Sequence, residues 1–299
     1  MSLDGFLGIA KPSGCTSHDV VDQIRRLFEI KKVGHTGTLD PMATGVLVLC
    51  LGKFTRLSQF VTVSDKKYRA QITLGIDTDT QDSEGQVIAE SEFGTFSQVQ
   101  LGEVLASFLG KSDQIPPMHS AVRIGGKRLY ELARKGQEVE RPGRAIEIFG
   151  IDLIDYQKPH LTLDVWCSKG TYIRTLASDI GKALDCGGHL SSLARTAVGN
   201  VSLSDCYSLE ELANSLSSQE SNVAPFLDVE NVLGLPRVSL SKTQLHTFVN
   251  GNAITELDNV GDRLGQTLCV FDCDSHLIGI GRWQPEGLRP MRVIAQREG

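Results

Sequence analysis

Long apolar runs are missing from this 299-residue chain. No stretch approaches the roughly 20 residues that a membrane-spanning helix needs. The first residues, MSLDGFLGIAKPSG, lack the basic start and the long apolar stretch of a signal peptide. The seven cysteines have no repeated spacing, which favours a reducing compartment over a disulfide framework. These absences predict a cytoplasmic globular protein with no membrane contact, and the length predicts two domains or one large and one small domain.

Motifs for metal and phosphate binding are also scarce. The chain contains no HExxH motif, no Walker-type loop and no nucleophile elbow. Cys269, Cys273 and His276 offer three of the four ligands that structural zinc takes, and no second pair follows. Cys269, Phe271 and Cys273 alternate along the chain, so we predict that they share one face of a strand. The sequence therefore predicts no metal site.

Basic residues are few overall but concentrated in one segment. The net charge is −6, whereas residues 117–144 hold seven basic and three acidic side chains. Segments 76–103 and 200–235 contain acids and no lysine or arginine. This separation predicts a basic surface that binds a polyanion, with a solvated helix face as the alternative.

The most informative segment that is present runs from 33 to 51 and reads VGHTGTLDPMATGVLVLCL. It places one carboxylate, Asp40, among glycines, threonines and a proline, immediately before an apolar run. Glycine allows the backbone to approach a ligand closely, and Pro41 restricts the backbone after the acid. The alternative is a turn in which Asp40 bonds to its own backbone.

Apolar periodicity places the remaining segments. We predict strands at 5–10, 68–74, 87–90, 145–155, 161–167 and 193–201, a buried segment at 43–52, and helices after Thr16 or Ser17 and over 99–109, 173–184 and 208–216. The polar stretch DTDTQDSEG is interpreted as a hairpin turn. Residues 127–135 are predicted to form a basic helix in a projecting insertion with few core contacts. Pro236 is expected to begin a small unit with a helix at 242–249 and strands at 267–271 and 277–282.

Two further side chains suggest a chemistry for Asp40. A carboxylate nucleophile must stay ionised, and the guanidinium of Arg174, in SKGTYIRTL, could hold it so. Tyr68 could stack on a base, and its hydroxyl could relay a proton. The alternatives are a strand aromatic and a structural ion pair, and the spacing alone does not bring the three residues together.

The segment GHTGTLDPMATGVLVLCLGKFTRL resembles the signature of the TruB family of tRNA pseudouridine synthases, which modify the T-loop uridine at position 55. Other motifs in the same order resemble that family: GFLGIAKPSGCTSHDVV, KKYRAQITLGIDTDTQDSEG, QIPPMHSAVRIGGKRLYELARKG, CSKGTYIRTLASDIG and GGHLSSLARTAVG. They cover most of residues 5–200. The C-terminal part resembles the small PUA-like RNA-binding unit of bacterial members less sharply.

The resemblance implies a role for each matching residue. Asp40 would attack the flipped nucleoside, Tyr68 would stack on the target base and take a proton, and Arg174 would pair with Asp40. His35 would support the loop that the uridine leaves. Further substrate-binding residues would be Lys11, Tyr172, Arg128 and Arg134. The family uses neither metal nor organic cofactor.

These expectations combine into one prediction. The fold is α+β, with a mixed, mainly antiparallel central sheet flanked by helices and a small β-rich PUA-like C-terminal domain. Residues 1–235 form the catalytic domain, with an RNA-binding insertion at 117–144, and residues 236–299 form the small domain. The expected partner is the T-arm of tRNA, bound by a cytoplasmic monomer without a protein partner. The alternatives are a non-catalytic tRNA-binding or tRNA-folding protein and a carboxylate-dependent hydrolase of small molecules.

Overall fold

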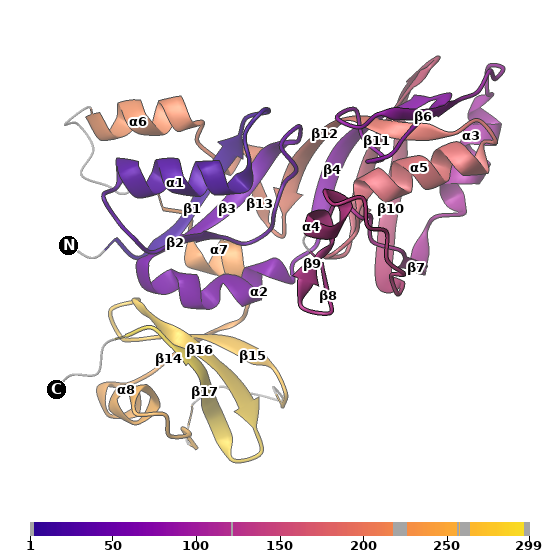
Figure 1. Cartoon of the computed structure of the whole chain (residues 1–299). Helices are drawn as coiled ribbons and strands as arrows, with labels where there is room; N and C mark the ends of the chain where they lie inside the picture. Colours follow the sequence, from indigo (N-terminus) through magenta and orange to yellow (C-terminus); the bar gives the residue numbers. More distant parts are fainter. Residues whose placement is uncertain (1–2, 121, 218–225, 256, 258–263, 296–299) are drawn as a thin grey trace.

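The central feature of the computed structural model is a nine-stranded sheet (Figure 1). The structure describes residues 3–120, 122–217, 226–255, 257 and 264–295. Seven strands follow one path in this order: β1 (Gly5–Lys11), β3 (Thr44–Leu51), β12 (Gly188–Val198), β4 (Lys66–Leu74), β11 (His160–Cys167), β10 (Arg144–Gln157) and β7 (Gly110–Gln114). β2 (Val33–His35) pairs with β3, and β13 (Val201–Ser202) pairs with β12.

One pairing divides this sheet into two halves. β3 and β12 run parallel and share only the pairs Ala194–Thr44 and Arg195–Gly45, whereas the other described neighbours in this sheet are antiparallel. The two halves of the sheet therefore meet along a short seam between β3, from the N-terminal part of the chain, and β12. The predicted mixed, mainly antiparallel sheet is confirmed.

Helices cover both halves, on faces that the apolar pattern selects. In the first half, α1 (Ser17–Leu27) and α6 (Leu209–Ser217) pack on β1 and β3. Thr16 caps α1 in a capping box with Asp19, as predicted for either Thr16 or Ser17. In the second half, α5 (Ile173–Ala183) and α3 (Gln98–Ala106) pack on β4, β11 and β10. Leu27, in the last turn of α1, follows the helical spacing of the buried Val20 and Ile24 but is 36% exposed.

The other face of β1 and β3 contacts short helices and the C-terminal unit. These helices are η1 (Gly52–Leu57), α2 (Ser58–Thr62) and α7 (Val229–Leu233). The C-terminal unit is a four-stranded sheet of β14 (Arg237–Ser239), β15 (Thr267–Phe271), β16 (Leu277–Gln284) and β17 (Gly287–Val293), with α8 (Lys242–Val249). Phe271 and Ile280 join the same buried cluster as Phe6 and Val46, so this unit packs directly on the large sheet.

Two details of the C-terminal unit differ from the sequence-based expectation. The predicted strands at 267–271 and 277–282 are present, but β14 and β17 were missed. Cys273 does not share the strand face of Cys269, because β15 ends at Phe271 and Cys273 lies exposed in the following turn. Among the described residues, no helix combines the length and the apolar character needed to cross a membrane.

The insertion at 117–144 also differs from its prediction. Gly125 and Gly126 have positive φ angles and form the turn of a small hairpin, β8 (Arg123–Ile124) and β9 (Lys127–Arg128). The helix α4 (Leu129–Ala133) therefore starts after Arg128 and is shorter than predicted. Leu129 and Leu132 are buried, but neither belongs to a core cluster of the described residues, and β8, β9 and α4 contact mainly one another. This agrees with the predicted insertion with few core contacts.

The strands around the acidic turn follow the predicted order. β4 alternates as expected, with Tyr68, Ala70 and Ile72 buried. β5 (Ile76–Thr78) and β6 (Val87–Glu90) form a two-stranded sheet on either side of the stretch read as a hairpin turn. β12 begins at Gly188, five residues before the expected start at 193, because His189 and Leu190 already pair with β4.

Candidate active site

A cavity of about 780 Å³ lies over the seam between the two halves of the sheet. Its walls come from segments far apart in sequence: the loop at 36–41, β4, the acidic turn, the insertion, the start of β10, the N-terminus of α5 and β12. Three predicted site residues, Asp40, Tyr68 and Arg174, line this one cavity. The structure thus brings together the residues that sequence spacing alone did not.

The loop that carries Asp40 is tied to the elements on both sides. Ser17, the first residue of α1, accepts a hydrogen bond from the Leu39 amide at 2.8 Å and donates one to the Leu39 carbonyl at 3.2 Å. The Ala43 amide donates to the Asp40 carbonyl at 3.1 Å. The Asp40 side chain keeps 36% exposure, so its carboxylate is fixed from behind and open toward the cavity.

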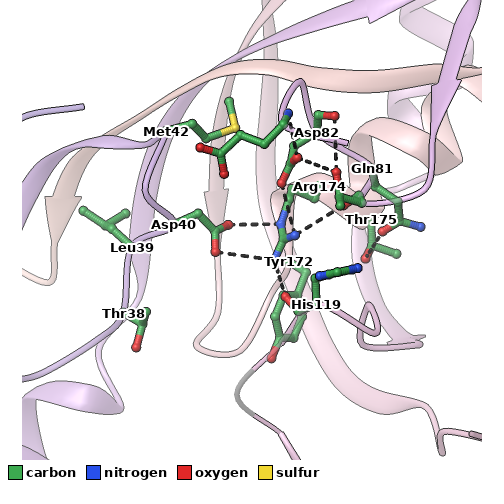
Figure 2. A network of polar contacts seen from close by, with 12 residues as sticks. Thr38, Leu39, Asp40, Met42, Gln81, Asp82, His119, Tyr172, Arg174 and Thr175 are labelled. Carbon is green, nitrogen blue, oxygen red and sulfur yellow. Dashed lines mark hydrogen bonds and ion pairs between the residues drawn. The ribbon is translucent and has the colours of Figure 1, made fainter. Parts of the chain in front are cut away.

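Arg174 lies in the first turn of α5 and pairs directly with Asp40 (Figure 2). Its Nε is 3.0 Å from one carboxylate oxygen of Asp40, and a terminal nitrogen is 3.4 Å from the other. The same guanidinium donates to the His119 carbonyl at 2.7 Å. The Arg174 side chain is only 5% exposed, so its orientation is set by these partners.

Asp82 is a site residue that the sequence analysis missed. It is 3.1 Å from Arg174, on the side of the guanidinium opposite Asp40, and its side chain is 4% exposed (Figure 2). Its carboxylate also accepts hydrogen bonds from the Thr80 hydroxyl at 2.5 Å and the Glu84 amide at 3.1 Å. The acidic stretch DTDTQDSEG was interpreted as a polar turn because such turns are rich in aspartate. The density of acids in that stretch was the only signal of a buried carboxylate.

Burial and Arg174 act in opposite directions on Asp40. Burial raises the pKa of the Asp40 carboxyl, the guanidinium of Arg174 lowers it, and the nearby carboxylate of Asp82 raises it again. Together these effects raise the pKa of Asp40 above its ordinary value. Arg174 therefore limits a rise in the pKa of Asp40 and does not depress it below the ordinary value, as the simple pairing argument would suggest.

Tyr68 lies on β4 and is 9% exposed on the cavity wall. Burial raises the pKa of its phenol, and the charge of Arg195 opposes that rise. Tyr68 is therefore a neutral phenol at neutral pH. It presents an apolar ring together with one hydroxyl to anything that enters the cavity.

Arg195 is a second residue of the cavity wall that the sequence analysis did not single out. It lies on β12, is 2% exposed and is the register partner of Tyr68 on β4. Its nitrogens donate to three backbone carbonyls: Val46 at 2.7 Å, Gly37 at 3.0 Å and Thr38 at 3.4 Å. The motif GGHLSSLARTAVG was recognised, but nothing in it distinguished a buried arginine from a surface one.

Two further predicted residues line the cavity. Tyr172 precedes α5, and its backbone is held at both ends by the Gln114 side chain, which accepts from the Tyr172 amide at 2.7 Å and donates to the Tyr172 carbonyl at 3.0 Å. Arg134 follows α4, with its guanidinium 5.6 Å from the Tyr130 ring. The insertion therefore forms one edge of the cavity.

Three other predicted residues lie outside the cavity lining. Lys11 is 1% exposed, and its ammonium donates to the carbonyls of Pro12, Cys15 and Pro41, so it fixes the start of the loop. His35 lies at the end of β2, where burial lowers its pKa and leaves the ring neutral. Arg128 is exposed and donates to the Tyr130 hydroxyl at 2.8 Å.

Asp272, Asp274 and His276 form the group of described residues whose spacing could suit a metal ion, with ligand atoms within 4.8 Å. They lie in the turn after β15, away from the cavity lining. The Asp272 carboxylate accepts the amide hydrogens of Asp274 and His276, at 3.0 and 2.8 Å. Ordinary turn hydrogen bonding accounts for this group.

Comparisons with known proteins identify the family of the chain. Residues 25–173 match the TruB family pseudouridylate synthase N-terminal domain, residues 174–232 the tRNA pseudouridylate synthase B C-terminal domain, and residues 236–294 the C-terminal region described as pseudouridine synthase II TruB. Proteins named tRNA pseudouridine synthase B are similar over nearly their full length. One from Caldanaerobacter subterraneus subsp. tengcongensis is 44% identical over 98% of this chain and 100% of its own. Another, from Dechloromonas aromatica, is 46% identical over 98% of this chain and 96% of its own.

The fold is also found in solved structures. A chain of the structure titled "Crystal Structure of a Cbf5-Nop10-Gar1 Complex" superposes with a TM-score of 0.78, covering 98% of this chain and 86% of that one at 24% identity. A chain of the archaeal box H/ACA sRNP Nop10-Cbf5 complex superposes with a TM-score of 0.73 at 20% identity, covering 98% and 87%. At these identities the match describes the fold.

Proposed function

The chain belongs to the TruB family of pseudouridylate synthases, and on that basis we propose that it converts uridine to pseudouridine in tRNA, at T-loop position 55. The observation that carries the proposal is the open carboxylate of Asp40, paired with the buried Arg174 at 3.0 Å inside a cavity large enough for a nucleoside. A base in a folded RNA loop must leave its stack to reach this carboxylate.

The chemistry requires no oxidant or reductant. The bond between N1 of the base and C1′ of the sugar breaks, a bond between C5 and C1′ forms, the C5 proton is removed, and N1 gains a proton. Asp40 is the nucleophile that adds to the flipped nucleoside and leaves again when the base is rejoined. Arg174 keeps this carboxylate ionised against its burial, and Asp82 holds the guanidinium from the far side.

Tyr68 is suited to hold the base during this rearrangement. Its ring offers a stacking surface at the cavity wall, and its hydroxyl can exchange a proton with the base beside the charge of Arg195. Tyr172 completes the wall next to Arg174. These roles follow from position and chemistry together.

RNA binding is assigned to surfaces around the cavity. Arg134 at its edge and Arg128 behind it would contact phosphates, and His35 would support the loop after the uridine leaves. We propose that residues 1–235 are the catalytic domain with its insertion at 117–144, and that residues 236–299 form an additional RNA-binding unit. We further propose that the enzyme acts as a monomer in the cytoplasm, where its seven free cysteines would stay reduced.

The two alternatives have less support. The relatives are named as synthases, and the carboxylate, its arginine and the tyrosine are all in place, so a purely RNA-binding protein leaves this cavity without a purpose. A hydrolase of small molecules leaves the basic insertion at the cavity edge unexplained.

Incubation with an unmodified tRNA transcript, followed by site-resolved detection of pseudouridine, tests the proposal. We expect conversion at position 55 of the T-loop and none in a transcript with cytidine at that position. Conversion at other uridines only would contradict the position, and no conversion of any uridine would contradict the activity.

A further inference from the structure

Arg195 is a buried cation without a carboxylate partner. Among the described residues, no carboxylate oxygen lies within 4.0 Å of its guanidinium, although its side chain is 2% exposed. Arg174, on the same cavity, is balanced by two carboxylates. Burying an unbalanced charge costs free energy, so a merely structural position would favour an apolar side chain of similar size.

The partners of Arg195 belong to two different segments. Nε donates to Val46 on β3, whereas the two terminal nitrogens donate to Gly37 and Thr38 in the loop that carries Asp40. The guanidinium thus joins the seam of the sheet to a loop only two residues from the proposed nucleophile. Its planar fork can serve these separated carbonyls at once, whereas one ammonium is a point charge.

Arg195 also lies next to Tyr68, the residue proposed to exchange a proton with the base. It is the register partner of Tyr68 across β12 and β4, and both side chains line the same cavity. Asp40 lies in the loop before β3 and Tyr68 lies on β4, and no hydrogen bond joins these two described side chains. Arg195 therefore hydrogen-bonds to the Asp40 loop and lies directly across the strand pair from Tyr68.

We propose that Arg195 is a positioning residue that holds the Asp40 loop and the Tyr68 hydroxyl in one fixed relation, so that attack by the carboxylate and proton exchange by the phenol act on the same base. The inference rests on the proposed function. It predicts that loss of the guanidinium slows the chemical step without weakening tRNA binding, because Arg195 is buried in the cavity wall and does not belong to the basic edge.

The test compares Arg195→Met, Arg195→Lys and Arg69→Met with the wild type. Arg69 is a matched control because it lies on β4 next to Tyr68, on the exposed face, paired with Asp164 at 2.7 Å. For each variant we would measure the single-turnover rate of pseudouridine formation at saturating enzyme, the Kd for the same tRNA and the melting temperature.

We expect a loss of rate on the order of 10²-fold for Arg195→Met and at least tenfold for Arg195→Lys, with Kd within about threefold of the wild type and with Arg69→Met unchanged in both. If Arg195→Met fails to fold, Arg195→Lys decides. A rate within threefold for the folded Lys variant, or a loss that appears in Kd alone, would overturn the inference. A wild-type enzyme that forms no pseudouridine would instead overturn the proposed function.

A spectroscopic measurement separates positioning from general stability. The phenol of Tyr68 is isolated by subtracting the ultraviolet titration of Tyr68→Phe, and the charged or titratable groups around it are Arg195, Cys167 and Asp40. We expect the pKa of Tyr68 to rise in Arg195→Met relative to wild type and to be unchanged in Arg69→Met. An unchanged pKa of Tyr68 in Arg195→Met would contradict the contact on which the inference depends.

Discussion

The Arg174 network and the basic insertion both place arginines at the same cavity, in opposite surroundings. The Arg174 side chain is 5% exposed, and its guanidinium is bonded to Asp40, Asp82 and the His119 carbonyl. Arg128 and Arg134 are exposed, and both guanidinium groups lie over the ring of Tyr130, at 5.8 and 5.6 Å. The charge of Arg174 is balanced by two carboxylates, whereas the charges of Arg128 and Arg134 are exposed at the surface.

This difference predicts how each region responds to change. In a buried network, removing one partner leaves another charge uncompensated, so single substitutions have large effects. At an exposed surface each charge contributes little, acts additively with its neighbours and is screened by salt. The four predictions below test this contrast.

Asp40→Asn should have the largest effect, a loss of pseudouridine formation of at least about 10³-fold, because an amide cannot act as the nucleophile. Binding of tRNA should change by less than threefold, since the cavity keeps its shape. Single-turnover conversion and filter binding of one transcript measure the two quantities. Turnover that survives the substitution would contradict the role of Asp40.

Asp82→Asn should come next. Breaking a buried ion pair costs about 3–5 kcal/mol, and if half of this cost is felt in the transition state, the rate falls by on the order of 10- to 100-fold. The melting temperature should also decrease, which calorimetry would measure. Asp164→Asn, which removes the carboxylate of the exposed Arg69 pair, is the control and should alter neither quantity appreciably. Equal effects of the two substitutions would remove the contrast between buried and exposed pairs.

The pH dependence should show opposite trends for activity and stability. Because burial raises the pKa of Asp40 above 3.8, activity should be lost on acidification at a higher pH than for an ordinary aspartate. Protonation of a group with a raised folded pKa favours the folded state, so the contribution of Asp40 to stability increases as the pH falls. Asp40→Asn should therefore melt above the wild type near neutral pH, with a gap that narrows in acid. A gap that is constant across pH would argue against the upward shift.

Arg128→Gln combined with Arg134→Gln should have the smallest effect. We expect tRNA binding to weaken by about tenfold or less at low salt, and the slope of log K against log salt to become shallower by about two, one for each lost phosphate contact. The single-turnover rate at saturating enzyme should be unchanged. A reduced single-turnover rate with an unchanged salt slope would indicate that these arginines act in the chemical step and do not contact phosphates.

The sequence predicts the residues that line the cavity better than the buried residues that hold them in place. Asp40, Tyr68 and Arg174 could be identified because their residue types suggest one chemistry and because the motifs that carry them resemble those of the TruB family. Asp82 looks like any aspartate in a polar turn, and only the fold brings it to Arg174 from 92 residues away. Lys11 was expected in the pocket, but its burial and its carbonyl partners depend on the tertiary structure.

The same limit applies to the fold. The helices α1, α5 and α8 follow from apolar periodicity and caps within a few residues of each boundary. The short edge strands β7 and β14 were missed because their side chains carry no alternating pattern and their neighbours in the sheet determine them. The insertion was expected to have few core contacts because prolines and paired glycines flank it, and its buried residues Leu129 and Leu132 indeed lie outside the described core clusters.

The close pairing of β3 with β12 requires that residue 45 has no Cβ atom. A Cβ at Gly45 would lie 2.2 Å from the Arg195 carbonyl oxygen, and the φ angle of Gly45 is +103°. Any larger residue would act as a wedge between the two half-sheets, which share only two residue pairs at this point. The close approach of β3 to β12 therefore depends on glycine at position 45, and a single added methyl group would displace the strand that carries Arg195 from the strand that follows the Asp40 loop.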